Sequence, residues 1–204
     1  MSAAIILAAG AGRRLGGVAK ALLTVRLDAR VKTFLEAIRD TCDLAGVTRS
    51  VVILGPPHGE VTRAEADRLG MSSVWNRDPD RGMASSVALG FGHALREFDE
   101  CSTALLWPVD HPAVTCDTVR AIVEALASGQ RAIAIPTLDG RGGHPAGFHR
   151  DSWQALASCL DAPEGARSVI HGYRTRHPDR VERIPLSDPA IVADVDIPKD
   201  LENL

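Results

Sequence analysis

Short apolar segments alternate with helix-like segments along the chain. The apolar runs are predicted as buried strands at residues 3–8, 50–57, 72–76, 103–110, 131–138 and 181–186. Residues 32–46 place Phe34, Leu35, Ile38 and Cys42 at helical spacing, and this helix is predicted to end at Gly46. Further helices are predicted at residues 64–70, 82–98, 115–128, 152–160 and 166–173.

This alternation predicts the fold class. Strands separated by helices favour a mostly parallel, twisted sheet that helices cover on both faces. Residues 1–204 show no internal repeat, low-complexity segment or linker, so we expect a single three-layer α/β/α domain. Such sheets bind ligands at the carboxyl ends of their strands. The loops after residues 3–8, 72–76 and 103–110 are therefore the first places to look for a site.

Composition narrows the function classes. The 204 residues carry a net charge of −3 and only 4% aromatic residues, which argues against a nucleic-acid partner. None of the four cysteines is spaced as in a zinc site or a disulfide framework. No apolar run has membrane-spanning length, and the start of the chain lacks the basic residues of a signal peptide. We expect a cytoplasmic protein without membrane contact.

The glycine-rich stretch LAAGAGRRLGGVAKALL, residues 7–23, follows the first predicted strand. A dinucleotide fingerprint needs a third glycine where this chain has Leu15, and a Walker loop needs a lysine where it has Val18. A looser anion-binding loop at a helix start remains, with Arg13, Arg14 and Lys20 as its cations. The segment alone supports a flexible connection with solvated arginines equally well.

The same stretch resembles the glycine-loop signature of the MobA-like nucleotidyltransferases. Further blocks resemble that superfamily in the same order, at residues 76–90, 107–112, 140–148, 161–170 and 194–204. The resemblance implies a Rossmann-like, GT-A-like fold and a Mg²⁺-dependent transfer of a nucleoside monophosphate from an NTP to a phosphorylated acceptor, with release of pyrophosphate. It also implies a transient partner enzyme that receives the product.

Two carboxylates are candidate metal ligands. Asp110 ends the central apolar run, where a carboxylate at a strand's carboxyl end could hold a divalent ion or cap the next turn. The resemblance implies that Asp110 and Asp196 bind Mg²⁺, although Asp194 lies two residues from Asp196 and stays an alternative. It also implies that Lys20 and Arg14 act with Asp110 in catalysis.

The remaining candidate residues would bind the substrates. The resemblance places Arg13 and Gly12 against the triphosphate, and the backbone of Leu7, Ala8, Ala9 and Gly10 against the base. It also places a loop that contains Gly82, Ser85 and Ser86 against the nucleotide. The two serines could equally cap a helix. Asn76 could contact the base or form a turn, and His144 and Arg167 could contact the acceptor phosphate or be ordinary polar surface residues.

The details of the blocks favour one branch. Residues 108–112, 142–145 and 165–167 look most like the molybdenum-cofactor cytidylyltransferases, which use CTP and molybdopterin. No glycine stands between Leu23 and the next helix, so a sugar phosphate or another small phosphate stays open as the acceptor. The alternatives from other classes are a non-catalytic nucleotide-binding protein and an NAD-dependent oxidoreductase. The sequence alone does not identify the base, the acceptor or the oligomeric state.

Overall fold

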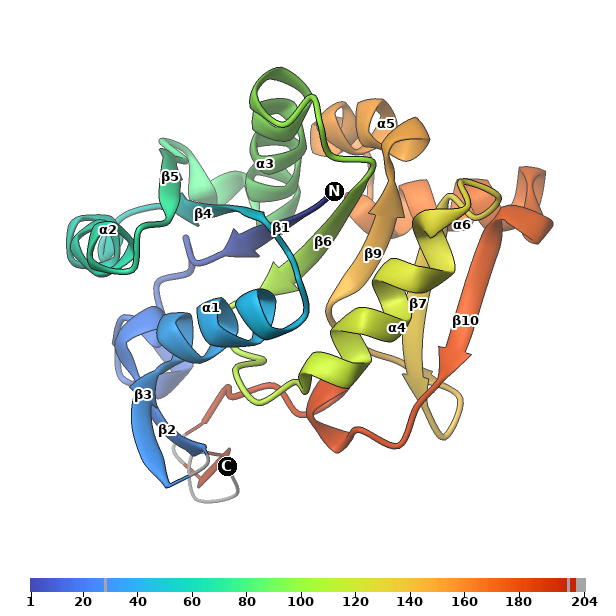
Figure 1. Cartoon of the computed structure of the whole chain (residues 1–204). Helices are drawn as coiled ribbons and strands as arrows, with labels where there is room; N and C mark the ends of the chain where they lie inside the picture. Colours follow the sequence, from blue (N-terminus) through green and yellow to red (C-terminus); the bar gives the residue numbers. More distant parts are fainter. Residues whose placement is uncertain (28, 198, 201–204) are drawn as a thin grey trace.

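The computed structural model describes residues 1–27, 29–197 and 199–200, and its centre is one twisted sheet (Figure 1). The strand order is β10-β7-β9-β6-β1-β4-β5, with β8 paired to β7. The strands are β1 (Ser2–Leu7), β4 (Arg49–Leu54), β5 (Ser72–Trp75), β6 (Thr103–Pro108), β7 (Ile133–Leu138), β8 (Arg141–Gly142), β9 (Ala146–His149) and β10 (Val181–Pro185). All pairs are parallel except those that involve β8 or β9. The predicted mostly parallel sheet is confirmed.

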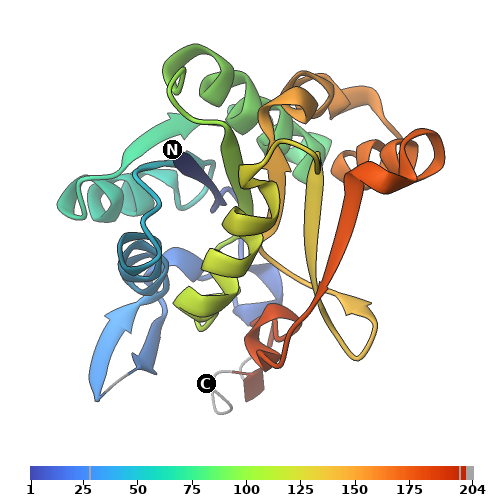
Figure 2. The same ribbon diagram turned by 45° about the vertical axis from the view of Figure 1, so that its right-hand side comes forward.

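Helices cover both faces of this sheet, as Figures 1 and 2 show. The helices are α1 (Phe34–Leu44), α2 (Gly59–Arg68), α3 (Met83–Glu97), α4 (Cys116–Ala127), α5 (Trp153–Ala157) and α6 (Ala166–Arg176). The helices α1, α2 and α4 pack on one face, and α3, α5 and α6 pack on the other. The three-layer α/β/α architecture expected from the sequence is therefore correct.

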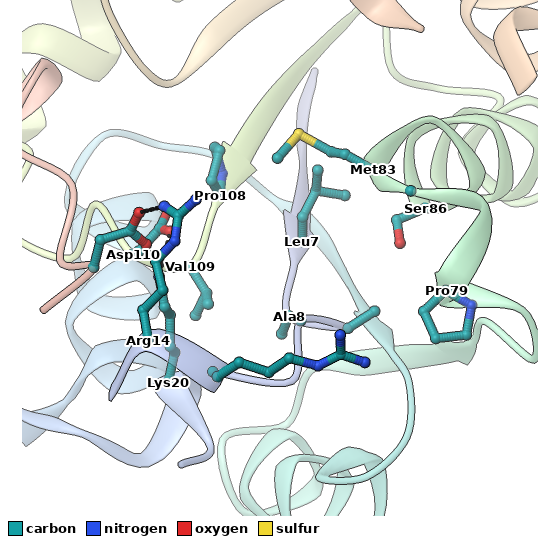
Figure 3. Close-up of a pocket in the computed structure, with 16 residues that line it drawn as sticks. Leu7, Ala8, Arg14, Lys20, Pro79, Met83, Ser86, Pro108, Val109 and Asp110 are labelled. Atoms are coloured by element: carbon teal, nitrogen blue, oxygen red, sulfur yellow. Dashed lines mark hydrogen bonds and ion pairs between the residues drawn. The ribbon is translucent and has the colours of Figure 1, made fainter. Parts of the chain in front are cut away.

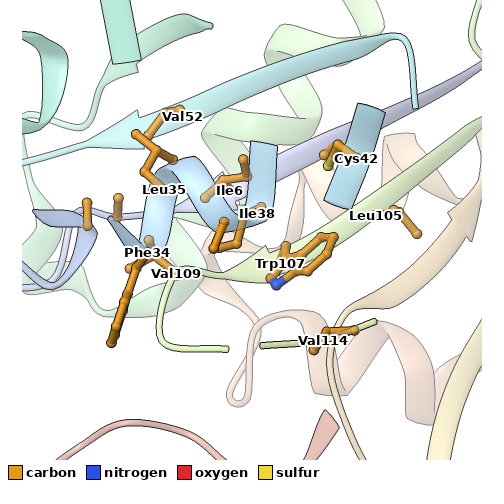
Figure 4. Packing of buried hydrophobic residues seen from close by; sticks show 14 of the residues in the cluster. Ile6, Phe34, Leu35, Ile38, Cys42, Val52, Leu105, Trp107, Val109 and Val114 are labelled. Atoms are coloured by element: carbon orange, nitrogen blue, oxygen red, sulfur yellow. The ribbon is translucent and has the colours of Figure 1, made fainter. Parts of the chain in front are cut away.

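The two faces carry separate hydrophobic cores because side chains alternate along each strand. On β1, Ala4 and Ile6 join the core beneath α1 and α4, whereas Ala3 and Ile5 join the core beneath α3 and α5. Figure 4 shows the first core, in which residues of α1 and β6 pack together. β1 is buried along its whole length, which explains its continuous apolar sequence.

The central helix α1 follows the predicted pattern closely. Phe34, Leu35, Ile38 and Cys42 are all buried. The hydroxyl of Thr33 accepts a hydrogen bond from the backbone N–H of Glu36 and so caps the helix at its N-terminus. After the helix ends, Gly46 takes a φ of 76°, which a glycine adopts without strain.

Five local features differ from the sequence prediction. Residues just before α1 form a hairpin of β2 (Thr24–Leu27) and β3 (Arg30–Thr33). The short antiparallel strand β9 lies between β6 and β7. The helix α2 begins at Gly59, earlier than predicted, and the helix expected at 152–160 is split into α5 and flanking 3₁₀ turns.

The fifth difference concerns the glycine-rich stretch. No α-helix follows β1 directly, because the chain forms two 3₁₀ turns, Arg13–Leu15 and Lys20–Leu22, before the hairpin. The α-helix start expected in this segment is therefore absent, whereas anion binding by the loop stays a prediction. Across the described residues, none of the helices combines the length and the apolar character needed to cross a membrane.

Candidate active site

A pocket of about 360 Å³ opens at the carboxyl ends of β1 and β6 (Figure 3). The lining residues are Leu7, Ala8, Ala9, Gly10, Gly12, Arg13, Arg14, Lys20, Pro79, Gly82, Met83, Ser86, Pro108, Val109, Asp110 and Asp196. Figure 3 shows Arg14, Lys20 and Asp110 on one side of it and Pro79, Met83 and other residues of the α3 end on the opposite side. The pocket therefore has a charged side and a less polar side.

A compact glycine loop forms the floor of the charged side. Gly12 has a φ of 59°, and its carbonyl accepts hydrogen bonds from the N–H groups of Leu15 and Gly17. A Cβ at this position would collide with the backbone of Val18. Leu15 is buried in the core where a dinucleotide fingerprint has its third glycine. The tight turn leaves Arg13 and Arg14 exposed at the pocket.

Asp110 and Asp196 reach the pocket from distant parts of the chain. Asp110 lies two residues after the end of β6, and the preceding Val109 donates its N–H to the carbonyl of Leu7 at 3.1 Å. The C-terminal segment is tied to the same place, because Val195 donates its N–H to the carbonyl of Asp110 at 3.0 Å and its side chain is buried. These backbone contacts place the two carboxylates side by side.

Both carboxylates converge on one lysine. The ammonium Nζ of Lys20 lies 2.9 Å from Oδ2 of Asp110 and 2.6 Å from Oδ1 of Asp196. Arg14 forms a second ion pair with Asp196. Burial alone lowers the pKa of Lys20, but the hydrogen bonds and charges of Asp196 and Asp110 outweigh it and raise that pKa. The hydrogen bond from Lys20 chiefly keeps the pKa of Asp196 below its usual range.

Asp200 acts on this site through the backbone. Its carboxylate accepts hydrogen bonds from the N–H groups of Asp196 and Ile197, each at 2.8 Å. These two bonds keep the pKa of Asp200 low. These contacts give Asp200 a structural role in the turn that follows Asp196. Asp194, in contrast, is exposed and is absent from the pocket lining.

The donor set of this cluster fits a divalent cation. Two carboxylate oxygens already lie within hydrogen-bonding distance of one cationic centre, the ammonium of Lys20. Among the described residues, no group of three or more His, Cys, Asp or Glu side chains could hold a metal. Mg²⁺ is commonly bound by one or two carboxylates together with substrate phosphates and waters. The residues that would hold such an ion here are Asp110 and Asp196.

The opposite wall is the N-terminal end of α3. Gly82 precedes the first turn, and no side chain caps this 15-residue helix. Ser86 lies in the pocket wall, and its hydroxyl accepts a hydrogen bond from Nδ2 of Asn76 at 3.0 Å. The free N–H groups at this helix end favour negative charge in the pocket. The expectation that Ser85 or Ser86 caps the helix with its side chain is not met.

Four predicted substrate residues do not line the pocket: Asn76, Ser85, His144 and Arg167. Asn76 is buried and bonds to Ser85, Ser86 and the N–H of Asp78, so its side chain organises the loop before α3. This is the turn role that the sequence left open. The serine hydroxyl of Ser85 is likewise used locally, since it donates to the carbonyl of Gly82.

The two residues predicted to contact the acceptor, His144 and Arg167, do not line the pocket. The ring of His144 lies 5.0 Å from that of His111, centroid to centroid, and burial chiefly lowers the pKa of His144 to about 4. The Nδ1 atom of His144 is buried without a hydrogen-bond partner among the described residues. Arg167 is exposed on the first turn of α6. Their contact with an acceptor stays a prediction.

Sequence reasoning missed four lining residues: Pro79, Met83, Pro108 and Val109. Pro108 and Val109 lie directly before Asp110 in a block that the sequence did single out. Met83 and Pro79 gave less signal, because an apolar residue beside a helix start is usually expected in the core. In fact Met83 is 64% exposed and lines the pocket.

The chain matches the MobA-like NTP transferase domain over residues 4–181. Nicotine blue oxidoreductase of Paenarthrobacter nicotinovorans is 30% identical over 205 residues, covering 98% of this chain and 94% of that protein. The structure of Rv0371c from Mycobacterium tuberculosis H37Rv has a TM-score of 0.79 at 28% identity, covering 99% of this chain and 95% of that one.

Two further structures support the same fold. A second structure of Rv0371c, a complex with manganese, has a TM-score of 0.74 at 25% identity, over 100% of this chain and 97% of that one. A nucleotidyl transferase from Methanothermobacter shares the fold with a TM-score of 0.78 at 20% identity, over 100% and 95% of the two chains. The domain match and the 30% identity to nicotine blue oxidoreductase show that the chain belongs to the MobA-like NTP transferase domain family.

Proposed function

We propose that this protein is a Mg²⁺-dependent nucleotidyltransferase that joins the nucleoside monophosphate of an NTP to a phosphorylated small molecule. One observation carries the proposal. Asp110, Asp196 and Lys20 meet at one side of a pocket whose floor is the glycine loop. Two carboxylates for a metal and three nearby cations are what a triphosphate needs for binding and charge neutralisation.

The chemistry follows from the positions of these groups. A phosphate oxygen of the acceptor attacks the α-phosphorus, and the bond to the β-phosphate oxygen breaks so that pyrophosphate leaves. Arg13, Arg14 and Lys20 would hold the triphosphate oxygens, which carry the growing negative charge. Bound Mg²⁺ would supply further charge neutralisation. The uncapped end of α3 adds N–H donors on the far wall.

The substrates proposed first are CTP and molybdopterin. They rest on the sequence blocks at residues 108–112, 142–145 and 165–167, which resemble the molybdenum-cofactor cytidylyltransferases. The test is a pyrophosphate-release assay that pairs each of the four NTPs with molybdopterin and with common sugar 1-phosphates. Release with CTP and molybdopterin is the expected result, whereas release with a sugar phosphate would select the other acceptor class.

A second candidate function is reduction by a nicotinamide cofactor. It is favoured by the 30% identity to nicotine blue oxidoreductase, which extends over nearly the whole of both chains. Against it, Leu15 is buried where a dinucleotide fold has a glycine, and the described glycine loop leads into 3₁₀ turns instead of an α-helix. Oxidation of NADH or NADPH, followed by absorbance with quinone-type dyes and without any NTP, would establish this alternative.

The proposal includes two further expectations from the sequence. The nucleotide product would pass to a transient partner enzyme, and the reaction would take place in the cytoplasm. A pyrophosphate-release signal that requires both an NTP and an acceptor also separates this enzyme from a non-catalytic nucleotide-binding protein. Such a binding protein would bind an NTP without any turnover.

A further inference from the structure

The arrangement of charges around Lys20 has a consequence for the order in which ligands bind. The ammonium of Lys20 occupies the space between the two carboxylates that would hold the metal, 2.9 Å from Asp110 and 2.6 Å from Asp196. Its side chain is only 15% exposed, so these contacts are partly shielded from solvent. A divalent cation bridging the same two oxygens cannot share that space with an ammonium.

We propose that Lys20 is a competitor of the metal in the free enzyme and that the triphosphate removes it. This inference rests on the proposed function and concerns the regulation of the same site. Without a triphosphate, a metal must displace Lys20 and then sit beside its positive charge. With a triphosphate in the pocket, Lys20 gains phosphate oxygens as partners and leaves Asp110 and Asp196 to the metal.

Contacts that do not involve Lys20 hold the backbone of both aspartates. The backbone N–H of Val195 donates to the carbonyl of Asp110, and Asp200 holds the N–H of Asp196. Arg14 remains paired with Asp196 when Lys20 moves. The two aspartates would therefore stay next to each other at the pocket once the ammonium has left.

The pocket contains a matched cation that lacks this geometry. Arg13 lines the same pocket, yet within the described part of the chain no hydrogen bond or ion pair joins its side chain to Asp110 or Asp196. Removal of Arg13 thus tests the effect of one positive charge in the pocket. Removal of Lys20 tests that effect together with the competition for the carboxylates.

Because Lys20 would contact both the carboxylates and the triphosphate, its replacement should change the affinity for the metal and the affinity for the triphosphate in opposite directions. Lys20→Met should tighten the binding of Mn²⁺ alone, because no ammonium competes for the carboxylates. The same change should weaken the binding of a metal-free triphosphate, because one of its cationic partners is lost. By thermodynamic linkage, the factor by which a bound triphosphate changes the affinity for the metal equals the factor by which a bound metal changes the affinity for the triphosphate.

The experiment uses the full chain and does not depend on turnover. Binding of Mn²⁺ is followed by electron paramagnetic resonance of the free ion, and binding of α,β-methylene-CTP is followed by calorimetry in EDTA. The proteins are wild type, Lys20→Met, Lys20→Gln as the conservative variant, and Arg13→Met as the control. Circular dichroism melting confirms that each variant is folded.

We expect Lys20→Met and Lys20→Gln to bind Mn²⁺ about tenfold more tightly than wild type, the order of one partly shielded ion pair. Arg13→Met should change Mn²⁺ affinity by less than about threefold, as a more distant charge does. All three variants should bind the analogue more weakly. Asp196→Asn in the Lys20→Met background should remove the gain in Mn²⁺ affinity.

Two results would overturn the inference. Equal or weaker Mn²⁺ binding by both Lys20 variants would show that Lys20 does not compete with the metal. A gain that survives Asp196→Asn would place the ion elsewhere. Either result, obtained with an enzyme that releases pyrophosphate from an NTP, leaves the proposed function standing. The expected pattern without any pyrophosphate release would instead retain the coupling and reject the transferase activity.

Discussion

At the scale of single residues, the candidate site is notable because several ordinary ion pairs are joined into one cluster. Asp110, Asp196, Arg14 and Lys20 form one connected cluster rather than separate surface pairs. The pairs of Lys20 are partly buried, and such pairs add little net stability because removing the charges from water costs free energy. A cluster beside a pocket with a glycine-loop floor is therefore better explained by ligand binding than by stabilisation of the fold.

Asp110→Asn keeps the size of the side chain and removes its charge. We expect pyrophosphate release to fall by about 100-fold or more, since loss of one charged group in such a site costs on that order. The melting temperature should change little, because the backbone contacts of residues 109 and 110 do not involve the carboxylate.

Asp194→Asn is the matched control for this prediction, because Asp194 is an exposed carboxylate of the same C-terminal segment that does not line the pocket. It should keep near-wild-type rates. A large loss in Asp194→Asn together with a small one in Asp110→Asn would reassign the essential carboxylate.

At the scale of elements, the loop after β1 matters because its backbone is tightly folded. The turn depends on a positive φ at Gly12 and on the close approach of the Val18 carbonyl. Lys20 begins the next 3₁₀ turn, so the geometry of this loop fixes where the lysine stands. Conformation of the loop and charge of the site are thus linked.

Gly12→Ala should disturb the site through the backbone. An added Cβ would meet the Val18 carbonyl and would also carry the cost of about 1 kcal/mol for a left-handed residue. We expect a lower melting temperature and a KM for the NTP that is raised by about tenfold, measured by pyrophosphate release.

Gly16→Ala separates these two causes. Gly16 has a φ of 81°, but a Cβ there would meet no atom within 4 Å. This variant should therefore show only the smaller effect of the backbone conformation. Indistinguishable melting temperatures and KM values for the two variants would rule out the close approach as the important feature.

The sequence pattern also missed some of the strands, and the reasons are physical. Strand β9 is short and contains Gly147, whose missing side chain lets Ile122 and Leu126 of α4 pack close to the sheet. A four-residue strand with a glycine gives almost no periodic signal. In the strands β2 and β3 only Val25 is buried, so they lack the apolar run by which the buried strands were found.

At the scale of the whole molecule, the fold brings residue 20, residue 110 and residue 196 together although they are far apart in the sequence. Strand β1 lies between β4 and β6, so the loops after β1 and β6 are neighbours. The C-terminal segment then crosses to these loops and hydrogen-bonds to Asp110. The site exists only when the chain is folded throughout.

This predicts that ligands of the pocket stabilise the whole chain. An NTP with Mg²⁺ at about 100 times its Kd should add about 2.7 kcal/mol, which corresponds to a rise in melting temperature of about 5–10 °C. Thermal-shift measurements with each NTP, with NADH and NADPH, and with and without Mg²⁺ test this. A shift with a nicotinamide cofactor alone would contradict the transferase proposal.

The sequence by itself determined the strand and helix periodicity, the mostly parallel sheet and the glycine loop, because these features depend on local patterns and on residues that are near in the chain. It also pointed to Asp110, Asp196 and Lys20 through their resemblance to known blocks. Only the tertiary structure decided that Lys20 bridges the two carboxylates and that Asp196 rather than Asp194 lines the pocket. It also decided that Asn76 bonds to Ser85 and Ser86 and is not part of the pocket lining. Those outcomes depend on contacts between residues that are distant in sequence, and no local pattern encodes them.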